Sequence, residues 1–204
     1  MITTPLTFCA TANTIIHTGA APVFVDIDPA TLNIDAEKIE AAITPHTKKA
    51  IVPVHFAGQS CDMDRILAIA KKYDLFVLED AAHALYTTYH GQPVGSIGDA
   101  TAFSFYATKN LATGEGGMLT TNDDALAARI RRLALHGMSK GAWNRYGEKG
   151  TWYYEVEEPG YKMNMFDVQA SLGLVQLNRL DDMQARREQI AKKHTIRLFK
   201  KKRV

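Results

Sequence analysis

Two charged residues stand at or just past the ends of two apolar segments, and one of them, Lys109, has almost no other charge nearby. The segment 75–80 (LFVLED) ends in Asp80, and the segment 100–105 (ATAFSF) is followed closely by Lys109. In open parallel sheets, ligands bind outside the carboxyl ends of the strands. If the two segments are neighbouring strands, the carboxylate and the amine share one pocket. Taken alone, Asp80 is more simply a cap for the next turn, and Lys109 an ordinary loop lysine.

A carboxylate and an amine over one pocket fit the chemistry of pyridoxal phosphate. The carboxylate keeps the cofactor's pyridine nitrogen protonated, and the charged ring then withdraws electrons when a bond to the substrate's Cα breaks. A lysine in a desolvated site carries the cofactor and moves the proton. We therefore predict that Lys109 holds the cofactor and that Asp80 faces its ring nitrogen. Glu79 points to the other side of the strand and is expected to be structural.

Hydroxyls and glycines surround the predicted pocket. Ser104 and Thr108 are suited to a phosphate, which proteins bind with hydroxyls and backbone N–H groups. The glycines of the segment 114–117 (GEGG) permit close backbone approach, but their spacing is not that of a dinucleotide-binding motif. His83 either lies flat against a cofactor ring or is satisfied by a neighbouring carbonyl. Glu115 receives no role.

Composition indicates a globular domain and excludes several classes of protein. The chain has 204 residues, and 46% are hydrophobic. No apolar run is long enough to span a bilayer and no secretory signal is recognisable, so we expect a cytoplasmic protein. Cys9 and Cys61 have neither disulfide-framework nor zinc-site spacing, so no metal is predicted and both are expected to be at least partly buried.

Positive charge is concentrated at the carboxyl end. Seven of the 24 Lys and Arg residues lie in 192–204, so the preceding chain has 17 against 22 acids and a formal net charge of −5. A basic tail is able to bind nucleic acid or anionic lipid, but such a terminus is more often disordered and solvated. We expect disorder here, and neither nucleic acid nor a membrane as the partner.

Short apolar runs alternate with helical patterns along most of the chain. This alternation predicts an α/β fold with a mainly parallel sheet and flanking helices. Most strands are continuously apolar and should be buried on both faces. The predicted strands are 21–27, 49–56, 75–80, 100–105 and 116–121. The predicted helices are 35–43, 63–73 with Asp62 as N-cap, and 122–135, opened by Asn122, Asp123 and Asp124.

The last third of the chain differs from the rest. Residues 137–160 are rich in Gly, Trp and Tyr, which indicates a functional or interface loop. One long helix is predicted from about Phe166 to His194. We divide the chain into a partial cofactor-binding domain (1–165), a long helix leading toward a further domain (166–191) and the basic tail (192–204).

Five ordered segments resemble one family. They are TFCATANTIIHTGAAPVFVDIDPATLNID, VPVHFAGQSCDMD, the run from VLEDAAHA to GEGGMLTTND, LALHGMSKGAW and PGYKMNMFDVQASLGLVQL. Together they are similar to the pyridoxal-phosphate aminotransferases of the DegT/DnrJ/EryC1/StrS group, which convert nucleotide-linked keto sugars into amino sugars. The resemblance covers residues 5–190.

The resemblance implies a fold-type I, aspartate-aminotransferase-like large domain that works as a homodimer. By motif position, Lys109 is the Schiff-base lysine, Asp80 pairs with the pyridine nitrogen, His83 contacts the ring and Ser104 binds the phosphate. In GYKMNMFD, Lys162 and Asn164 fall where related enzymes reach the partner's cofactor phosphate. A lysine at 109 also distinguishes the chain from the family's dehydratases, which have histidine there.

Members of the family are much longer than this chain, so the resemblance implies a fragment truncated at both ends. The leading hypothesis is an aminotransferase for a nucleotide-linked sugar with glutamate as amino donor, in polysaccharide or related biosynthesis. Its substrate is expected near Trp143, Arg145, Trp152 and Tyr153. The alternative is an inactive fragment that binds a full-length relative, and a third hypothesis is nucleic-acid binding by the tail.

Overall fold

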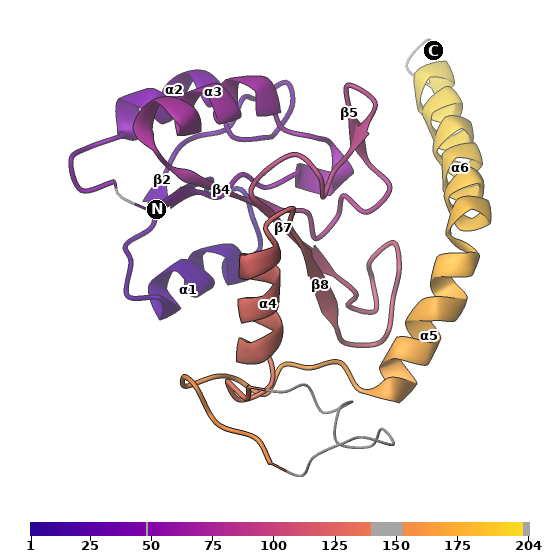
Figure 1. The fold of residues 1–204 in the computed structure, drawn as a ribbon. Helices are drawn as coiled ribbons and strands as arrows, with labels where there is room; N and C mark the ends of the chain where they lie inside the picture. Colours follow the sequence, from indigo (N-terminus) through magenta and orange to yellow (C-terminus); the bar gives the residue numbers. More distant parts are fainter. Residues whose placement is uncertain (48, 140–152, 202–204) are drawn as a thin grey trace.

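The computed structural model of the chain describes residues 1–47, 49–139 and 153–201. Its centre is a six-stranded sheet in the order β2-β1-β3-β4-β7-β8 (Figure 1). Neighbouring strands are parallel except β7 and β8, which are antiparallel. The strands are β1 (Ile2–Thr3), β2 (Val23–Phe24), β3 (Ala50–Ile51), β4 (Phe76–Asp80), β7 (Ala100–Ser104) and β8 (Gly117–Thr120). A mainly parallel sheet with flanking helices confirms the predicted fold class.

Helices connect most of the strands, and a small β-hairpin stands apart from the main sheet. The hairpin consists of β5 (Thr88–Tyr89) and β6 (Gln92–Pro93). The helices are α1 (Cys9–His17), α2 (Ala36–Ile39), α3 (Met63–Tyr73), α4 (Asp124–Leu133), α5 (Asp167–Asn178) and α6 (Leu180–Lys201), with 3-10 turns at Glu40–Ala42 and Phe56–Gly58. The sequence analysis did not predict α1, β1 or the hairpin.

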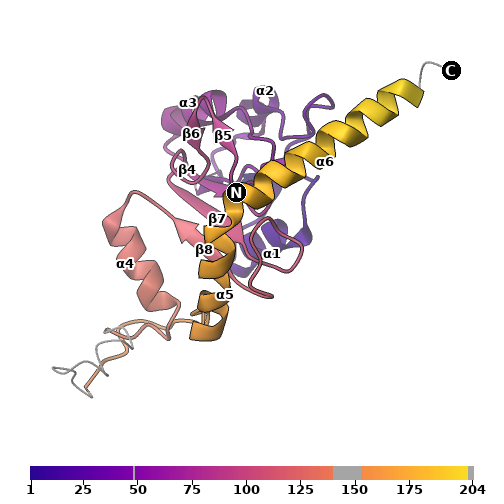
Figure 2. The same ribbon diagram turned by 90° about the vertical axis from the view of Figure 1, so that its right-hand side faces the viewer.

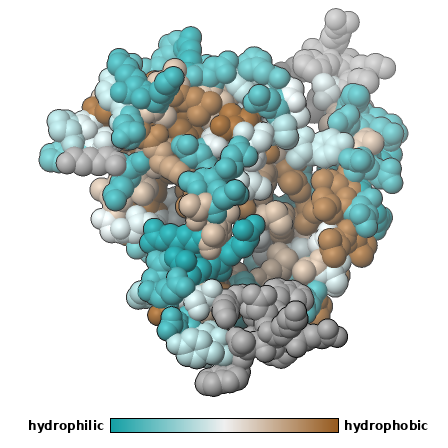
Figure 3. Space-filling model, in the orientation of Figure 1, coloured by the Kyte–Doolittle hydropathy of each residue, from teal (hydrophilic) through white to brown (hydrophobic). Residues whose placement is uncertain are grey.

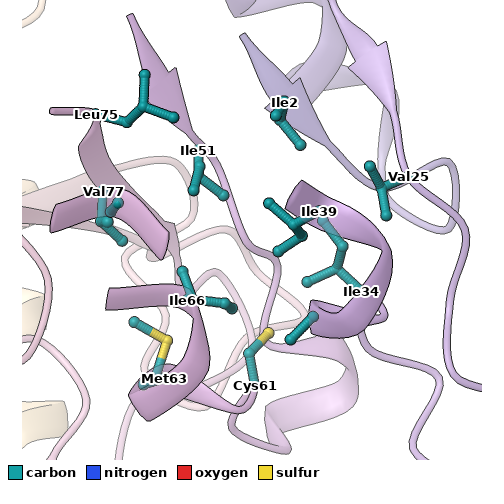
Figure 4. Packing of buried hydrophobic residues seen from close by; sticks show 12 residues of the cluster. Ile2, Val25, Ile34, Ile39, Ile51, Cys61, Met63, Ile66, Leu75 and Val77 are labelled. Carbon is teal, nitrogen blue, oxygen red and sulfur yellow. The ribbon is translucent and has the colours of Figure 1, made fainter. Parts of the chain in front are cut away.

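The main hydrophobic core lies between the sheet and helices α2 and α3. Ile51 of β3 and Val77 of β4 pack in one cluster with Ile39 of α2 and Ile66 of α3 (Figure 4). All four side chains are at most 1% exposed. Burying one such aliphatic side chain contributes about 1.5–3 kcal/mol to stability. This cluster therefore anchors the middle strands of the sheet.

The opposite face of the same strands packs on α1. Ala50, Val52 and Leu78 form a second cluster with Ile15 of α1. Side chains alternate between the two faces of a strand, so Asp80, two residues after Leu78, lies on the α1 face. The fold thereby determines which helix meets the carboxylate at the end of β4.

Acidic side chains cap three helices. Asp62 accepts a hydrogen bond from the backbone N–H of Arg65 at 3.3 Å, which confirms it as the N-cap of α3. Asp123 caps α4 through Leu126, and Asp35 caps α2 through Glu37. A side chain that accepts from a free N–H of the first turn stabilises a helix by about 1 kcal/mol. The predicted starts of these helices are therefore confirmed to within two residues.

The outer strands depart from the expected two-sided burial. Val23 and Phe24 of β2 are 38% and 52% exposed, and Met118 of β8 is 57% exposed. The expectation is wrong for these two strands because each lies at an edge of the sheet. Strand β8 also runs antiparallel to β7, so a direct chain reversal replaces a crossover helix there.

The carboxyl-terminal region is helical throughout its described part. Two helices, α5 and α6, replace the single long helix predicted, because the backbone leaves helical geometry at Arg179 (φ −109°, ψ 3°). Helix α6 continues to Lys201 and extends away from the body of the molecule (Figure 2). The expected disorder of the tail stays a prediction. No Gly or Pro interrupts this stretch, and Lys, Arg and Leu favour a helix.

Helix α5 exposes a hydrophobic surface. Its exposed apolar residues are Val168, Leu172, Leu174, Val175 and Leu177, each more than half exposed. Figure 3 shows hydrophobic residues gathered on this side of the molecule. Within the part of the chain that the structure describes, no helix has the length and apolar character needed to cross a membrane.

Candidate active site

Strands β4 and β7 bring Asp80 and Ser104 to the same end and the same face of the sheet. They are parallel neighbours in which Asp80 lies opposite Ala102. Thr101 donates to Glu79 at 2.7 Å, so these two residues share the face that turns away from α1. Alternation then places Asp80, Ala102 and Ser104 on the α1 face. The two strands are therefore neighbours, as the sequence analysis required.

Asp80 is the last residue of β4 and is half-buried. Its Oδ2 accepts a hydrogen bond from Thr11 Oγ1 of α1 at 2.7 Å, and its Oδ1 accepts one from the backbone N–H of Ala82 at 3.1 Å. One of these donors belongs to the turn after the strand, and the other to a helix 69 residues earlier in the chain. The carboxylate thus caps the turn and still lies at the carboxyl end of its strand.

Lys109 lies in the compact loop that follows β7 and is half-buried. Its backbone N–H donates to Tyr106 at 2.9 Å, and the loop is closed by bonds from Thr113 N to Phe105 O and from Phe105 N to Gly116 O. The neighbouring Asn110 donates its amide to Leu85 O at 3.2 Å. That bond joins the loop of Lys109 to the loop that follows Asp80.

His83 lies near both charges. Partial desolvation lowers its pKa from the ordinary value, and the nearby ammonium of Lys109 lowers it further, while the carboxylate of Asp80 acts in the opposite direction. The residue as a whole is exposed, so its ring retains an open face. Both charges act on this imidazole, so Asp80 and Lys109 each lie near His83. Their roles toward a cofactor stay predictions.

Glu79 is held in a buried network on the opposite face of β4. Its carboxylate accepts hydrogen bonds from His55 Nε2 (2.8 Å), the Gly98 N–H (2.8 Å) and the Thr101 hydroxyl (2.7 Å). His55 Nδ1 accepts from the Cys61 N–H at 3.1 Å, so the ring proton lies on Nε2. Burial pushes the pKa of Glu79 upward, but the hydrogen bonds outweigh it and hold the pKa below its ordinary value. A structural role for Glu79 is confirmed.

Two glycines permit close packing around the site. Gly58 has a positive φ of 86°, and a Cβ there would lie 2.8 Å from the carbonyl oxygen of His83. Thr87 also donates to the Gly58 carbonyl at 2.7 Å, so the turn 56–58 supports the loop that carries His83. A Cβ at Gly117 would lie 2.6 Å from Phe103 O. The predicted close approach at the glycine-rich segment is therefore confirmed, whereas Gly58 had not been singled out.

Ser104 and the pair Lys162 and Asn164 lie on separate parts of the chain. The hydroxyl of Ser104 accepts from the Tyr106 N–H at 3.3 Å. Lys162 donates to the side chain of Asn164 at 2.6 Å on an exposed segment. This segment is attached to the end of α4, since Met163 N donates to Ala134 O at 2.8 Å. Their roles toward a phosphate stay predictions.

The two cysteines have opposite environments. Cys61 is 1% exposed, and burial raises the pKa of its thiol to about 12. Cys9, at the start of α1, is exposed, so its predicted burial is wrong. It lies in the first turn of the helix that the sequence analysis did not predict. Among the described residues, His, Cys, Asp and Glu side chains form no group able to hold a metal.

Most of the predicted substrate loop lies outside the described residues, including Trp143, Arg145 and Trp152. Tyr153 is 54% exposed. The residue nearest the chemistry that sequence reasoning missed is Thr11. Its signal is the recurrence of threonine at 7, 11 and 14, a helical spacing that places Thr11 and Thr14 on one side of α1, with Thr7 just before the helix.

A family model confirms the identity that the motifs indicated. The model of the DegT/DnrJ/EryC1/StrS aminotransferase family matches residues 1–202. The chain belongs to this family. The homologues of the chain in this family are pyridoxal-phosphate-dependent sugar aminotransferases.

Two curated relatives share this region. The spore coat polysaccharide biosynthesis protein SpsC of Bacillus subtilis is 75% identical over 191 residues, covering 94% of this chain and 49% of the relative. The GDP-perosamine synthase of Caulobacter vibrioides is 49% identical over 190 residues, covering 93% and 48%. The chain thus spans about half the length of these family members.

A solved family member has the same fold. The putative sugar aminotransferase Spr1654 from Streptococcus pneumoniae, in its PMP-form, superposes with a TM-score of 0.85 at 40% identity, over 94% of this chain and 53% of that one. The PLP-form of the same protein superposes with a TM-score of 0.83. The likeness shows that the sheet and its helices form a fold-type I arrangement.

Proposed function

We propose that this chain forms the cofactor-binding part of an aminotransferase that converts a nucleotide-linked keto sugar into an amino sugar. The observation that carries the proposal is that β4 and β7 are parallel neighbours, so that Asp80 ends one strand and Lys109 follows the other, with His83 in the field of both charges. The names of the relatives support the substrate class, since one is a GDP-perosamine synthase and another serves polysaccharide biosynthesis.

The side chains present fit pyridoxal phosphate. The side chains at this end of β4 and β7 offer an amine for the aldehyde, a carboxylate for the ring nitrogen and the Ser104 hydroxyl for the phosphate. When bound, this cofactor supplies a protonated ring that withdraws electrons from the carbon being changed. The donor set therefore matches the three chemically distinct ends of the molecule.

Each of the chain's residues has a separate task in this proposal. The Lys109 amine attaches the cofactor and then takes and returns the proton at the reacting carbon, as a general base and acid. The Asp80 carboxylate keeps the ring nitrogen protonated. His83 lies against the ring, and the lowered pKa keeps its imidazole neutral, so that it adds no positive charge there. Ser104 and Thr108 offer hydroxyls to the phosphate.

The proposed assembly is a homodimer in the cytoplasm. Lys162 and Asn164 form one exposed polar pair, and we propose that this pair reaches the phosphate held by the partner. The amino donor is glutamate, and the sugar nucleotide binds near the loop 137–160. Tyr153 of this loop is exposed and is able to contact a substrate base.

Cofactor binding tests the proposal directly. Titrating the chain with pyridoxal phosphate should produce a new visible absorption band that borohydride treatment fixes to the protein. Lys109→Ala should abolish both the band and the fixed cofactor. The matched control is Lys49→Ala, which removes an exposed lysine from the other half of the sheet. A band that persists in Lys109→Ala would contradict the assignment of this lysine.

A second function has support of its own, from the exposed hydrophobic surface of α5. In this alternative the chain is catalytically incompetent and at most binds a full-length relative. The wild-type chain would then show no absorption band at any cofactor concentration. Co-purification with a longer family member would support this alternative, and a cofactor band on the isolated chain would contradict it.

A further inference from the structure

We propose that Thr11 is a positioning residue that holds the Asp80 carboxylate in one orientation toward the ring nitrogen of pyridoxal phosphate. The inference rests on the proposed function, because it assigns the carboxylate to that nitrogen. It concerns a residue of α1, the helix that sequence reasoning did not predict. Its basis is the hydrogen bonding around Asp80.

Two donors from different parts of the fold hold the carboxylate. Thr11 Oγ1 donates to Oδ2 at 2.7 Å, and the Ala82 N–H donates to Oδ1 at 3.1 Å. With one donor on each oxygen, rotation of the carboxylate would break both bonds. A carboxylate has about four acceptor positions, so these bonds leave it able to accept from a further N–H. The site thus has a carboxylate that is oriented and still has acceptor capacity.

The Thr11 hydroxyl is itself held by a second hydroxyl. Thr7 Oγ1 lies 2.8 Å from Thr11 Oγ1. A hydroxyl carries one proton, and that of Thr11 is given to Asp80, so Thr7 is the donor to Thr11. The two threonines and the carboxylate form a chain in which each bond polarises the next. Hydrogen bonds donated to a carboxylate favour its charged form.

Apolar contacts also attach α1 to the sheet. Ile15 already packs against Ala50 and Val52 on this face. Thr11 is only 5% exposed, and a buried hydroxyl is costly unless it has a partner, which here is Asp80. A valine would fill nearly the same volume in that position. The hydroxyl, as distinct from the side chain's shape, is therefore best explained by its action on Asp80.

Thr14 offers a matched control in the same helix. Its hydroxyl donates only to backbone carbonyls of α1, those of Ala10 at 2.9 Å and Thr11 at 3.1 Å. Thr14→Val therefore removes a threonine hydroxyl from the same helix without removing a donor to Asp80. Thr11→Ser is the conservative variant, since it keeps a hydroxyl on the same carbon.

The experiment compares two ligands by calorimetry. One is pyridoxal phosphate, and the other is its carbocyclic analogue, in which a C–H group replaces the ring nitrogen. Thr11→Val should weaken binding of pyridoxal phosphate by about 10-fold, the effect of losing one hydrogen bond to a charged group, and should leave binding of the analogue unchanged. Thr11→Ser should restore the wild-type affinity, and Thr14→Val should match wild type with both ligands.

Equal affinity of wild type and Thr11→Val for pyridoxal phosphate would overturn the inference. An equal loss of affinity for both ligands would also overturn it, because it indicates a structural role. If Thr11→Val does not fold, Thr7→Val takes its place, with a smaller loss expected for pyridoxal phosphate alone; no selective loss there overturns the inference. If the wild-type chain binds neither ligand, the proposed function itself fails, which is a different result from failure of the Thr11 role.

Discussion

Two neighbouring carboxylates, Glu79 and Asp80, lie on opposite faces of β4 and have opposite environments. Glu79 is fully buried, and three donors from three different segments bond to it. Asp80 is half-buried at the carboxyl end of β4 and accepts two hydrogen bonds. A carboxylate whose acceptors are used within the protein stabilises the fold, whereas one with remaining acceptors is able to serve a ligand. Because side chains alternate along a strand, Glu79 supports the fold while the adjacent Asp80 stays available to a ligand.

Removing Glu79 should give the largest loss of stability. Glu79→Ala leaves His55, the Gly98 N–H and Thr101 without their acceptor in the interior, which should cost about 3–5 kcal/mol of unfolding free energy. Urea denaturation followed by far-UV circular dichroism measures this. A loss no greater than that of Asp80→Ala would mean that the two faces do not differ as described.

Gly58→Ala should have the next largest effect. The positive φ of 86° and the approach of His83 O to 2.8 Å of the added Cβ both strain the variant, at a cost of about 1–3 kcal/mol. Cofactor affinity should also fall, because the loop of His83 must move. Gly91→Ala is the control, since its φ is +80° but its Cβ would meet nothing within 4 Å. If the two variants lost equal unfolding free energy, the contact with His83 would not explain the cost of Gly58→Ala.

Low pH should reduce the stability that Glu79 contributes. The pKa of Glu79 in the folded chain is below its ordinary value of 4.5, so its contribution to stability is present above that pH and is lost as pH falls through the folded pKa. The unfolding free energy of Glu79→Gln should therefore fall less steeply than that of wild type below pH 4.5. Parallel pH profiles of the two proteins would contradict this assignment.

Asp80→Asn should change stability least and binding most. The variant keeps the size of the side chain but only one of its two acceptor oxygens, so we expect a stability loss of about 0.5–1.5 kcal/mol, less than for Glu79→Ala. Affinity for pyridoxal phosphate should fall by at least about 10-fold, because an amide does not stabilise a protonated ring nitrogen. Thermal unfolding and calorimetric titration of the same sample check both parts. A variant that lost stability but kept its cofactor would reverse the roles given to the two faces.

Sequence reasoning was most successful where local chemistry decides the structure. Asp62 caps its helix as expected because the capping bond spans only three residues. Asp80 and Lys109 were recognised because each ends an apolar segment, and a strand's end is visible in its own residues. The division of Glu79 and Asp80 between two faces follows from the period of a strand.

Other features depend on contacts between distant segments. The bond from Thr11 to Asp80 joins residues 69 positions apart. The burial of β2 and β8 was misjudged because position at an edge depends on the order of strands in the sheet. The extension of α6 to Lys201 differs, because it follows from a local preference of its residues for helix. The charge composition of the tail had been taken to favour disorder instead.

The sequence by itself determined the strand and helix segments of the middle of the chain, the alternation that separates Glu79 from Asp80, and the family motif around Lys109. The tertiary structure alone decided that β4 and β7 are neighbours, that α1 covers the Asp80 face, and that a threonine hydroxyl meets the carboxylate. The physical reason is that helices and strands follow from local hydrogen bonding and side-chain periodicity. Contacts between separate segments depend on how all of them share one core.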